Sequence, residues 1–148
     1  MFGRKNKNYD VQLDIYNWNR LAGNEVPDYP IDVSDRMFWH RAIIEGDILR
    51  EEVEEYTRAM ADRNRIEYAD ALADIVIVAY GQAAKAGFDL NLFVKEAMEA
   101  NWSKADPETG EFLRNEIGKI QKGPSYQKPK MFNVMMKQLR KGGAKRVW

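Results

Sequence analysis

Apolar residues recur at helical spacing along most of the chain. In the stretch from Asp10 to Leu21, Val11, Ile15 and Trp18 fall on one face, at spacings of four and three. Further stretches run from a cap at Ser34 or Asp35 to about Asp62, from Arg65 to Ala86, from a cap at Asp89 to near Lys104, and onward from Pro129. The pattern predicts an all-α fold of the four-helix-bundle type, then a short irregular or hairpin segment and a C-terminal helix.

Two acidic clusters interrupt the apolar faces of the second and third predicted helices. The first is Glu51, Glu52, Glu54 and Glu55, and the second is Asp70 and Asp74. At 100° per residue, Glu52 falls in the middle of the apolar arc, and Asp74 lies in a stretch that is apolar nearly all round. Because an unpaired buried carboxylate costs several kcal/mol, acids that face a core from two helices favour a bound divalent metal.

Two other interpretations of these acids stay open. A run such as Glu51 to Glu55 is commonly a solvated helix face. An inward aspartate can also pair with an arginine, and Arg50, Arg58, Arg63 and Arg65 are near in sequence. Buried ion pairs are weak stabilisers, so pairing alone does not explain why the two helices carry so many acids.

Composition narrows the chemistry. The 148 residues include no cysteine and one histidine, His40, which excludes thiol catalysis and leaves a metal held by oxygen: Mg²⁺, Mn²⁺ or Ca²⁺. The length fits one domain over residues 1–148. The longest apolar run, 71–84, is too short to cross a membrane, and the first residues lack the apolar stretch of a signal peptide. We expect a cytoplasmic protein without a membrane partner.

The net charge of zero hides a basic end. After Glu116 the chain has nine basic residues and no acid. A basic segment beside an acidic centre suits a polyanionic ligand such as a triphosphate. Nucleic acid is the competing explanation, and a merely solvated basic helix is the third.

The motifs resemble those of a known superfamily. Glu51-Glu52-x-x-Glu55, with Asp70 to Asp74 fifteen residues later, resembles the EExxE…ExxD signature of the all-α nucleoside triphosphate pyrophosphohydrolases, which include MazG-like proteins, dimeric dUTPases and phosphoribosyl-ATP pyrophosphohydrolases. Asn101-Trp102-Ser103-Lys104, Gly118-Lys119-x-x-Lys122-Gly123, Tyr126 and Pro129 resemble the phosphoribosyl-ATP pyrophosphohydrolase-like branch of phages and bacteria. The resemblance covers residues 49–129. The chain departs from the family signature at Ala71, where the family has an acidic residue. Asp70 stands next to Ala71 in the sequence.

The resemblance implies a site with two parts. The catalytic residues are Glu51, Glu52, Glu55 and Asp74. Mg²⁺, or Mn²⁺ in its place, is held by Glu52, Glu55, Asp70 and Asp74. The substrate-binding residues are Asn101, Lys104, Lys119, Lys122 and Tyr126. The catalytic core spans about 34–129, and 130–148 form a basic C-terminal helix and tail.

The implied reaction is Mg²⁺-dependent hydrolysis of a nucleoside or deoxynucleoside triphosphate to monophosphate and pyrophosphate, by water attack at the α-phosphate. The resemblance also implies a homodimer or homotetramer, with Tyr80, Met98 and Met131 to Met136 as candidate interface residues. The expected partner is the nucleoside triphosphate, not nucleic acid. Two alternatives are a non-catalytic helical module that binds nucleic acid or nucleotide, and a dUTP-specific diphosphatase. The preferred base stays open, as does phosphoribosyl-ATP as substrate.

Overall fold

The fold is known from a computed structural model, which describes residues 9–28, 30–31 and 36–140. By its internal contacts the chain divides into two compact units: residues 1–88 with 142–148, and residues 89–141. The described residues form five α-helices and no strand, which confirms the all-α prediction. The expected helix caps Ser34 and Asp35 and the end of the basic tail lie outside the described residues. The single-domain prediction stays a prediction.

Helix α1 (Val11–Leu21) begins and ends where the sequence predicts. The Asp10 carboxylate accepts a hydrogen bond from the Leu13 backbone nitrogen at 3.1 Å and caps the helix. Its inward face matches the predicted one only in part, because Ile15 is buried but Trp18 is 63% exposed, while Tyr16 and Asn19 are also buried. The Tyr16 hydroxyl donates to the backbone carbonyl of Phe88, and that polar partner helps to turn Tyr16 inward.

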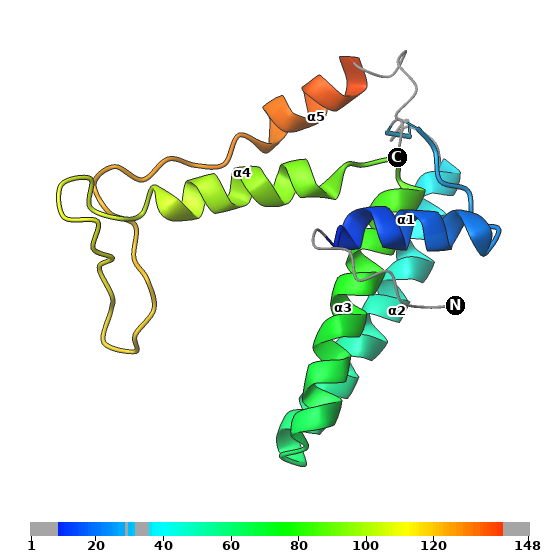
Figure 1. The fold of residues 1–148 in the computed structure, drawn as a ribbon, viewed down its shortest axis with the longest axis horizontal. Coiled ribbons are helices and arrows are strands. Elements are labelled where there is room, and N and C mark those ends of the chain that lie inside the picture. The colour runs from blue at the N-terminus through cyan, green and yellow to red at the C-terminus, as the bar shows by residue number, and fades with distance from the viewer. Residues whose placement is uncertain (1–8, 29, 32–35, 141–148) are drawn as a thin grey trace. The chain divides into compact units, whose positions relative to one another are not determined.

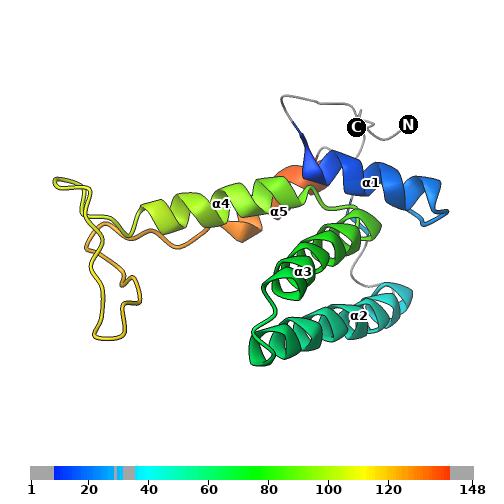
Figure 2. The same cartoon turned by 60° about the horizontal axis from the view of Figure 1, so that its bottom comes forward.

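Helices α2 (Arg36–Ala61) and α3 (Arg65–Lys85) form an antiparallel pair and lie side by side in Figures 1 and 2. The turn between them is short. Arg63 takes a left-handed conformation with φ of 53°, and the Asn64 side chain accepts hydrogen bonds from the backbone nitrogens of Ile66 and Glu67. Glu45, in the first half of α2, contacts Gln82 and Lys85, near the end of α3. The two helices therefore lie side by side from these residues to the turn that joins them.

Small residues let α1 approach α3. A Cβ atom on Gly81 would lie 3.5 Å from Nδ2 of Asn19, and Ala83 and Ala84 are buried. Further from this crossing, α3 is less covered than its apolar sequence predicts, since Leu72, Val76 and Ile77 are 40–44% exposed. Among the described residues of the first unit, α2 and α1 pack on α3, and two neighbours do not surround it.

The second unit contains α4 (Leu90–Trp102) and α5 (Met131–Arg140), which pack against each other. Gln138 is 1% exposed and pairs with the backbone of Asp89, accepting from its nitrogen at 2.9 Å and donating to its oxygen at 3.2 Å. Helix α4 ends two residues before the predicted Lys104, and α5 begins two residues after Pro129. The segment between them contains one antiparallel bridge, Arg114 to Ile120, which fits the short hairpin that the sequence allows.

No single described helix is both long and apolar enough to cross a membrane; α3 and α4 meet the length and composition test only as a bent pair.

Candidate functional site

The antiparallel register brings the two acidic clusters to the same level of the α2–α3 pair. Seven residues separate Glu45 from Glu52 on α2, and eight separate Asp74 from Gln82 on α3. Because Glu45 contacts Gln82, Glu52 lies near Asp74 across the helix pair. Both side chains are half-buried, whereas Glu51, Glu54, Glu55 and Asp70 are exposed. Glu52 thus lies toward the inside of the helix pair, as the sequence predicts. It is less enclosed than the sequence predicts, because its side chain is only half-buried.

The pKa of the Glu52 carboxyl is raised by burial and by the acids around it. Partial burial raises the pKa of the Glu52 carboxyl above its ordinary value, and the charges of Asp74, Glu55, Glu51 and Asp70 raise it further. Two of these four charges come from α2 and two from α3. Glu52 is therefore the point at which the acids of both helices meet.

The donor set fits a hard divalent cation. All the groups are carboxylates, which are the ligands that Mg²⁺ and Ca²⁺ take in proteins, and a cation there would relieve the repulsion that raises the pKa of Glu52. In the part of the chain that the structure describes, no three acidic or histidine side chains are gathered closely enough to hold a metal ion as they stand. Side chains on the exposed rim would have to converge on the ion.

Arginine pairing, one of the alternative interpretations, involves Glu55 but neither aspartate. Nη2 of Arg58 lies 3.7 Å from Oε1 of Glu55, and both side chains are more than half exposed, so the pair is weak. Asp70 and Asp74 form no ion pair with any described residue. Next to Glu55, a cavity of about 290 Å³ opens at the turn end of the helix pair, lined by acidic residues with Arg58 and Asn64 among them.

In the second unit, four of the five predicted substrate-binding residues form two close pairs near the end of α4. Nζ of Lys104 lies 2.6 Å from Oδ1 of Asn101, three residues earlier in the chain. Nζ of Lys122 lies 4.8 Å from the centre of the Tyr126 ring, a cation–π contact. The fifth residue, Lys119, lies in the bridged loop, where its backbone nitrogen donates to Asn115 Oδ1 at 2.8 Å.

Contacts made by Ser103, Gly123 and Ser125 hold these two pairs together. We call these three residues the serine clasp. The Ser103 hydroxyl donates to the Ala100 carbonyl at 2.7 Å and accepts from the Gln127 nitrogen at 2.8 Å. The Ser125 hydroxyl donates to the Ala105 carbonyl at 3.0 Å. The clasp therefore fixes the segment that carries Lys122 and Tyr126 against the segment that carries Lys104.

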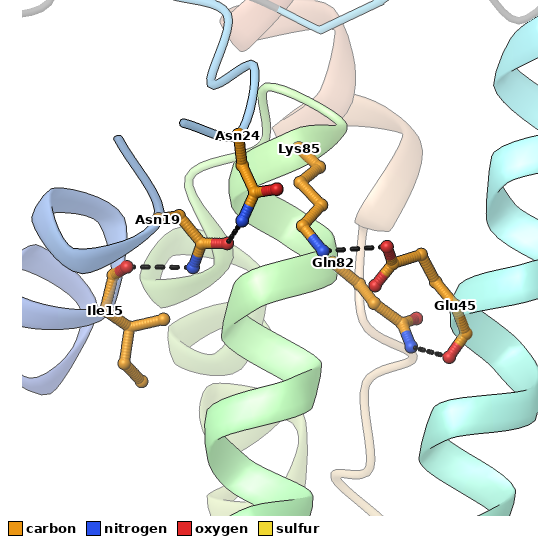
Figure 3. A network of polar contacts seen from close by, with 6 residues as sticks. All are labelled: Ile15, Asn19, Asn24, Glu45, Gln82 and Lys85. Carbon is orange, nitrogen blue, oxygen red and sulfur yellow. Dashed lines mark hydrogen bonds and ion pairs between the residues drawn. The ribbon is translucent and has the colours of Figure 1, made fainter. Parts of the chain in front are cut away.

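Sequence reasoning missed the roles of the clasp and of a second polar network. Ser103 and Gly123 stand inside the motifs that the resemblance quotes, which is a signal, but nothing in the sequence indicates that they contact each other's segments. The second network consists of two separate sets of contacts, one between Asn19 and Asn24 and one that joins Glu45 to Gln82 and Lys85 (Figure 3). Its members are spread over three helices and a loop, at spacings that no local pattern connects.

The sequence model of one protein family decides the classification. The model of the phosphoribosyl-ATP pyrophosphohydrolases matches residues 19–101, which is 83 of the 148 residues. The chain belongs to the phosphoribosyl-ATP pyrophosphohydrolase family. That family is part of the all-α nucleoside triphosphate pyrophosphohydrolase superfamily, so the resemblance stated from the motifs is confirmed. No curated protein matches the chain.

Membership of the phosphoribosyl-ATP pyrophosphohydrolase family makes the chain a hydrolase of phosphoric anhydrides with a nucleotide-type substrate. Members of the family generally depend on a divalent metal. The matched region includes both acidic clusters and ends at Asn101. The roles of the individual site residues stay predictions, as do the cytoplasmic location and the partners.

Proposed function

We propose that this member of the phosphoribosyl-ATP pyrophosphohydrolase family hydrolyses a nucleoside or deoxynucleoside triphosphate to monophosphate and pyrophosphate with Mg²⁺. The observation that carries the proposal is the environment of Glu52, a half-buried carboxyl whose pKa is raised by burial and by four acids from two helices. A like-charged centre of this kind is stable when a cation binds it, and a polyphosphate substrate brings Mg²⁺ with it.

The roles proposed for the acids follow from where they lie. Glu52 and Asp74, the less exposed pair, would hold Mg²⁺ together with Glu55 and Asp70 from the rim. Bound there, Mg²⁺ supplies positive charge to the phosphate oxygens and lowers the pKa of a water molecule. Glu51 is exposed and is the acid in this set that we do not assign to the metal, so we propose that it accepts the proton of the attacking water.

The basic residues of the second unit are proposed to bind the phosphates. Lys104 is held by Asn101, and Lys122 by the Tyr126 ring. Both ammonium groups keep N–H donors to offer, and we propose that their positive charge would stabilise the negative charge of the leaving pyrophosphate. Lys119 lies in a separate loop, and we propose that it contacts the outer phosphate.

We also propose that the working form is a homo-oligomer, a dimer or a tetramer. Ile43, Ile44 and Ile48 on α2 and Leu72, Val76 and Ile77 on α3 are 38–68% exposed. Large exposed apolar side chains on two neighbouring helices are typical of a protein interface. A second copy of the same helix pair would bury both surfaces in one bundle. Tyr80 and Met98 stay candidate interface residues.

The experiment is a product assay. The purified protein is incubated with each ribo- and deoxynucleoside triphosphate and with phosphoribosyl-ATP, with and without Mg²⁺, and the products are identified by phosphorus NMR. We expect monophosphate and pyrophosphate from a triphosphate, only with metal, and a loss of at least about 100-fold in rate for Glu52→Gln. Glu54→Gln, an exposed acid on the same helix, is the matched control and should keep its activity.

Other results would redirect the proposal. Turnover of phosphoribosyl-ATP alone would assign that substrate, and turnover of dUTP alone would support the dUTP-specific alternative. Release of single phosphate would contradict attack at the α-phosphate. No turnover by a folded, metal-loaded protein would favour the non-catalytic binding module.

A further inference from the structure

A cavity of about 550 Å³ lies in the first unit, between the first half of α2, the last turns of α3 and the loop after α1. No role in the proposed reaction has been given to it. Its lining includes the aromatic rings of Phe38 and Phe88 and the polar side chains of Asn24, Glu45, Gln82 and Lys85. The volume is large enough for a small organic molecule. The lining residues indicate which kind of molecule the cavity would bind.

The cavity lies on the same two helices as the acids. Glu45 is seven residues from Glu52 on α2, and Gln82 is eight residues from Asp74 on α3. At 1.5 Å per residue these spacings are about 10 and 12 Å. A nucleotide with its phosphates at the acids would therefore reach the cavity with its sugar and base.

The charges of the cavity balance. Nζ of Lys85 lies 2.7 Å from Oε1 of Glu45, with both side chains less than one third exposed. At the mouth, Nη1 of Arg41 lies 2.8 Å from Oε2 of Glu25. Each cation is paired with an anion, so the cavity has no net charge for a phosphate and suits an uncharged ligand.

Backbone carbonyls fix the orientation of the amide side chains, as Figure 3 shows. A carbonyl can only accept, so the side chain of Gln82 must turn its nitrogen to the Glu45 carbonyl, 2.6 Å away. Likewise Asn19 turns its nitrogen to the Ile15 carbonyl and its oxygen to Asn24, whose nitrogen donates to it at 3.0 Å. Asn24 and Gln82 thereby each use one of the two N–H donors of the amide nitrogen, and their oxygens are left.

The polar groups that remain include three acceptor oxygens, beside one N–H of each amide nitrogen. Oδ1 of Asn24, Oε1 of Gln82 and the second carboxylate oxygen of Glu45 accept no hydrogen bond from any residue that the structure describes. The ammonium of Lys85 keeps donors beyond its bond to Glu45. A ligand that satisfies the acceptor oxygens and Lys85 is flat enough to stack on an aromatic ring, uncharged, and carries neighbouring N–H donors next to one acceptor.

We propose that this cavity binds the nucleobase of the substrate and that it prefers guanine. The ring N1–H and the 2-amino group of guanine are adjacent donors, which match the oxygens of Gln82 and Glu45. The O6 carbonyl beside them is an acceptor, which matches Lys85. Adenine and cytosine place a ring acceptor beside the amino group, and hypoxanthine lacks the 2-amino donor. The inference rests on the proposed function for its substrate class.

The test measures binding of nucleosides, which have no phosphates and need no metal. Guanosine, inosine and adenosine are titrated into the full-length protein by calorimetry. Guanosine should bind at least about fivefold more tightly than inosine, the value of one hydrogen bond, and adenosine more weakly still. The guanosine–inosine comparison uses the unaltered protein, so it does not depend on a variant that folds.

Two variants locate the binding. Gln82→Met keeps the length of the side chain and removes its amide oxygen, and should abolish the difference between guanosine and inosine. Arg50→Gln, an exposed α2 residue outside the cavity lining, should leave it unchanged. Equal binding of guanosine and inosine, binding unaffected by Gln82→Met, or no nucleoside binding because another copy of the chain fills the cavity would each overturn the proposal.

The two proposals fail separately. Guanosine binding without turnover of any triphosphate would contradict the proposed reaction and leave the base site standing. Turnover of all triphosphates at equal kcat/KM, without guanosine binding, would contradict the base site and leave the reaction standing.

Discussion

Gly123 packs so closely against the backbone of Lys104 that a Cβ atom on Gly123 would lie 2.6 Å from the Lys104 carbonyl oxygen. That separation is far inside van der Waals contact, and a backbone atom cannot swing aside as a side chain can. Gly123→Ala should therefore open the serine clasp and lower the free energy of unfolding by about 1–3 kcal/mol. Urea denaturation measures the loss, and KM for the triphosphate should rise as Lys122 moves away from Lys104.

Gly46→Ala is the control for that substitution. A Cβ atom on Gly46 would have no neighbour within 4 Å, and Gly46 lies inside α2. Alanine there should stabilise the helix by up to about 1 kcal/mol. If both alanines destabilised the protein equally, the close approach of Gly123 would not be the cause.

Asp106 makes the stability of the turn after α4 depend on pH. Backbone hydrogen bonds from Thr109 and then Glu108 hold the pKa of the Asp106 carboxyl below its ordinary value. Because the folded value is depressed, the stabilisation is present above the ordinary aspartate pKa of about 3.9 and is lost as the pH falls through the folded value. Asp106→Asn should be less stable than the unaltered protein at pH 7, with a difference that shrinks on acidification.

Urea denaturation over a series of pH values measures that difference. Glu108→Gln, at an exposed position in the same turn, is the matched control and should not reproduce it. A difference between Asp106→Asn and the unaltered protein that persisted at pH 2 would mean that the charge of Asp106 is not responsible.

Glu52→Gln should stabilise the metal-free protein and weaken its response to Mg²⁺. The raised pKa of Glu52 means that its ionised form is disfavoured in the folded state, so stability falls as the pH rises through that pKa. Removing the charge should gain less than about 1 kcal/mol at pH 7, because the side chain is partly solvated. Thermal denaturation with and without Mg²⁺ tests both parts. Glu54→Gln should respond to Mg²⁺ as the unaltered protein does.

Val76→Glu should dissociate the proposed oligomer. Val76 is 43% exposed on the apolar surface of α3, and a carboxylate buried at a subunit interface without a partner costs several kcal/mol. Light scattering coupled to size exclusion would show a mass that falls toward that of one chain. Glu54→Lys, a charge change on the outward face of α2, should leave the mass unchanged. A monomeric unaltered protein would contradict the oligomer directly.

Helix periodicity and capping residues predicted the helices well, because both act over a few residues. Helix α1 spans the predicted residues, and α2 ends and α3 begins within one residue of their predicted places. The predicted end of α4 and start of α5 are each two residues from their observed places. Ser103 ends α4 through contacts with Gln127, 24 residues away, and such a partner is invisible to a local pattern.

In the candidate site, too, features that depend on local spacing were predicted better than features that depend on residues far apart in sequence. Asn101 and Lys104 are three residues apart, and local spacing can indicate a contact of this kind. The face of α1 was predicted in part: Ile15 is buried, but Trp18 is exposed, and Tyr16 is turned inward by a carbonyl 72 residues away. The meeting of Glu52 with Asp74 was predicted because two in-phase stripes on consecutive helices must face each other. The cavity beside Glu45 was not predicted, since it depends on how α1, α2 and α3 are placed around it.

The three-residue turn between α2 and α3 also affects how the protein folds. Contacts between helices joined by so short a turn are close in sequence, and local contacts of this kind form rapidly. The helix pair should therefore appear early in refolding with Ile44, Ile48 and Val76 still exposed. If α2 and α3 meet a second copy, the late phase of refolding is bimolecular, and its rate should rise with protein concentration while the early phase does not.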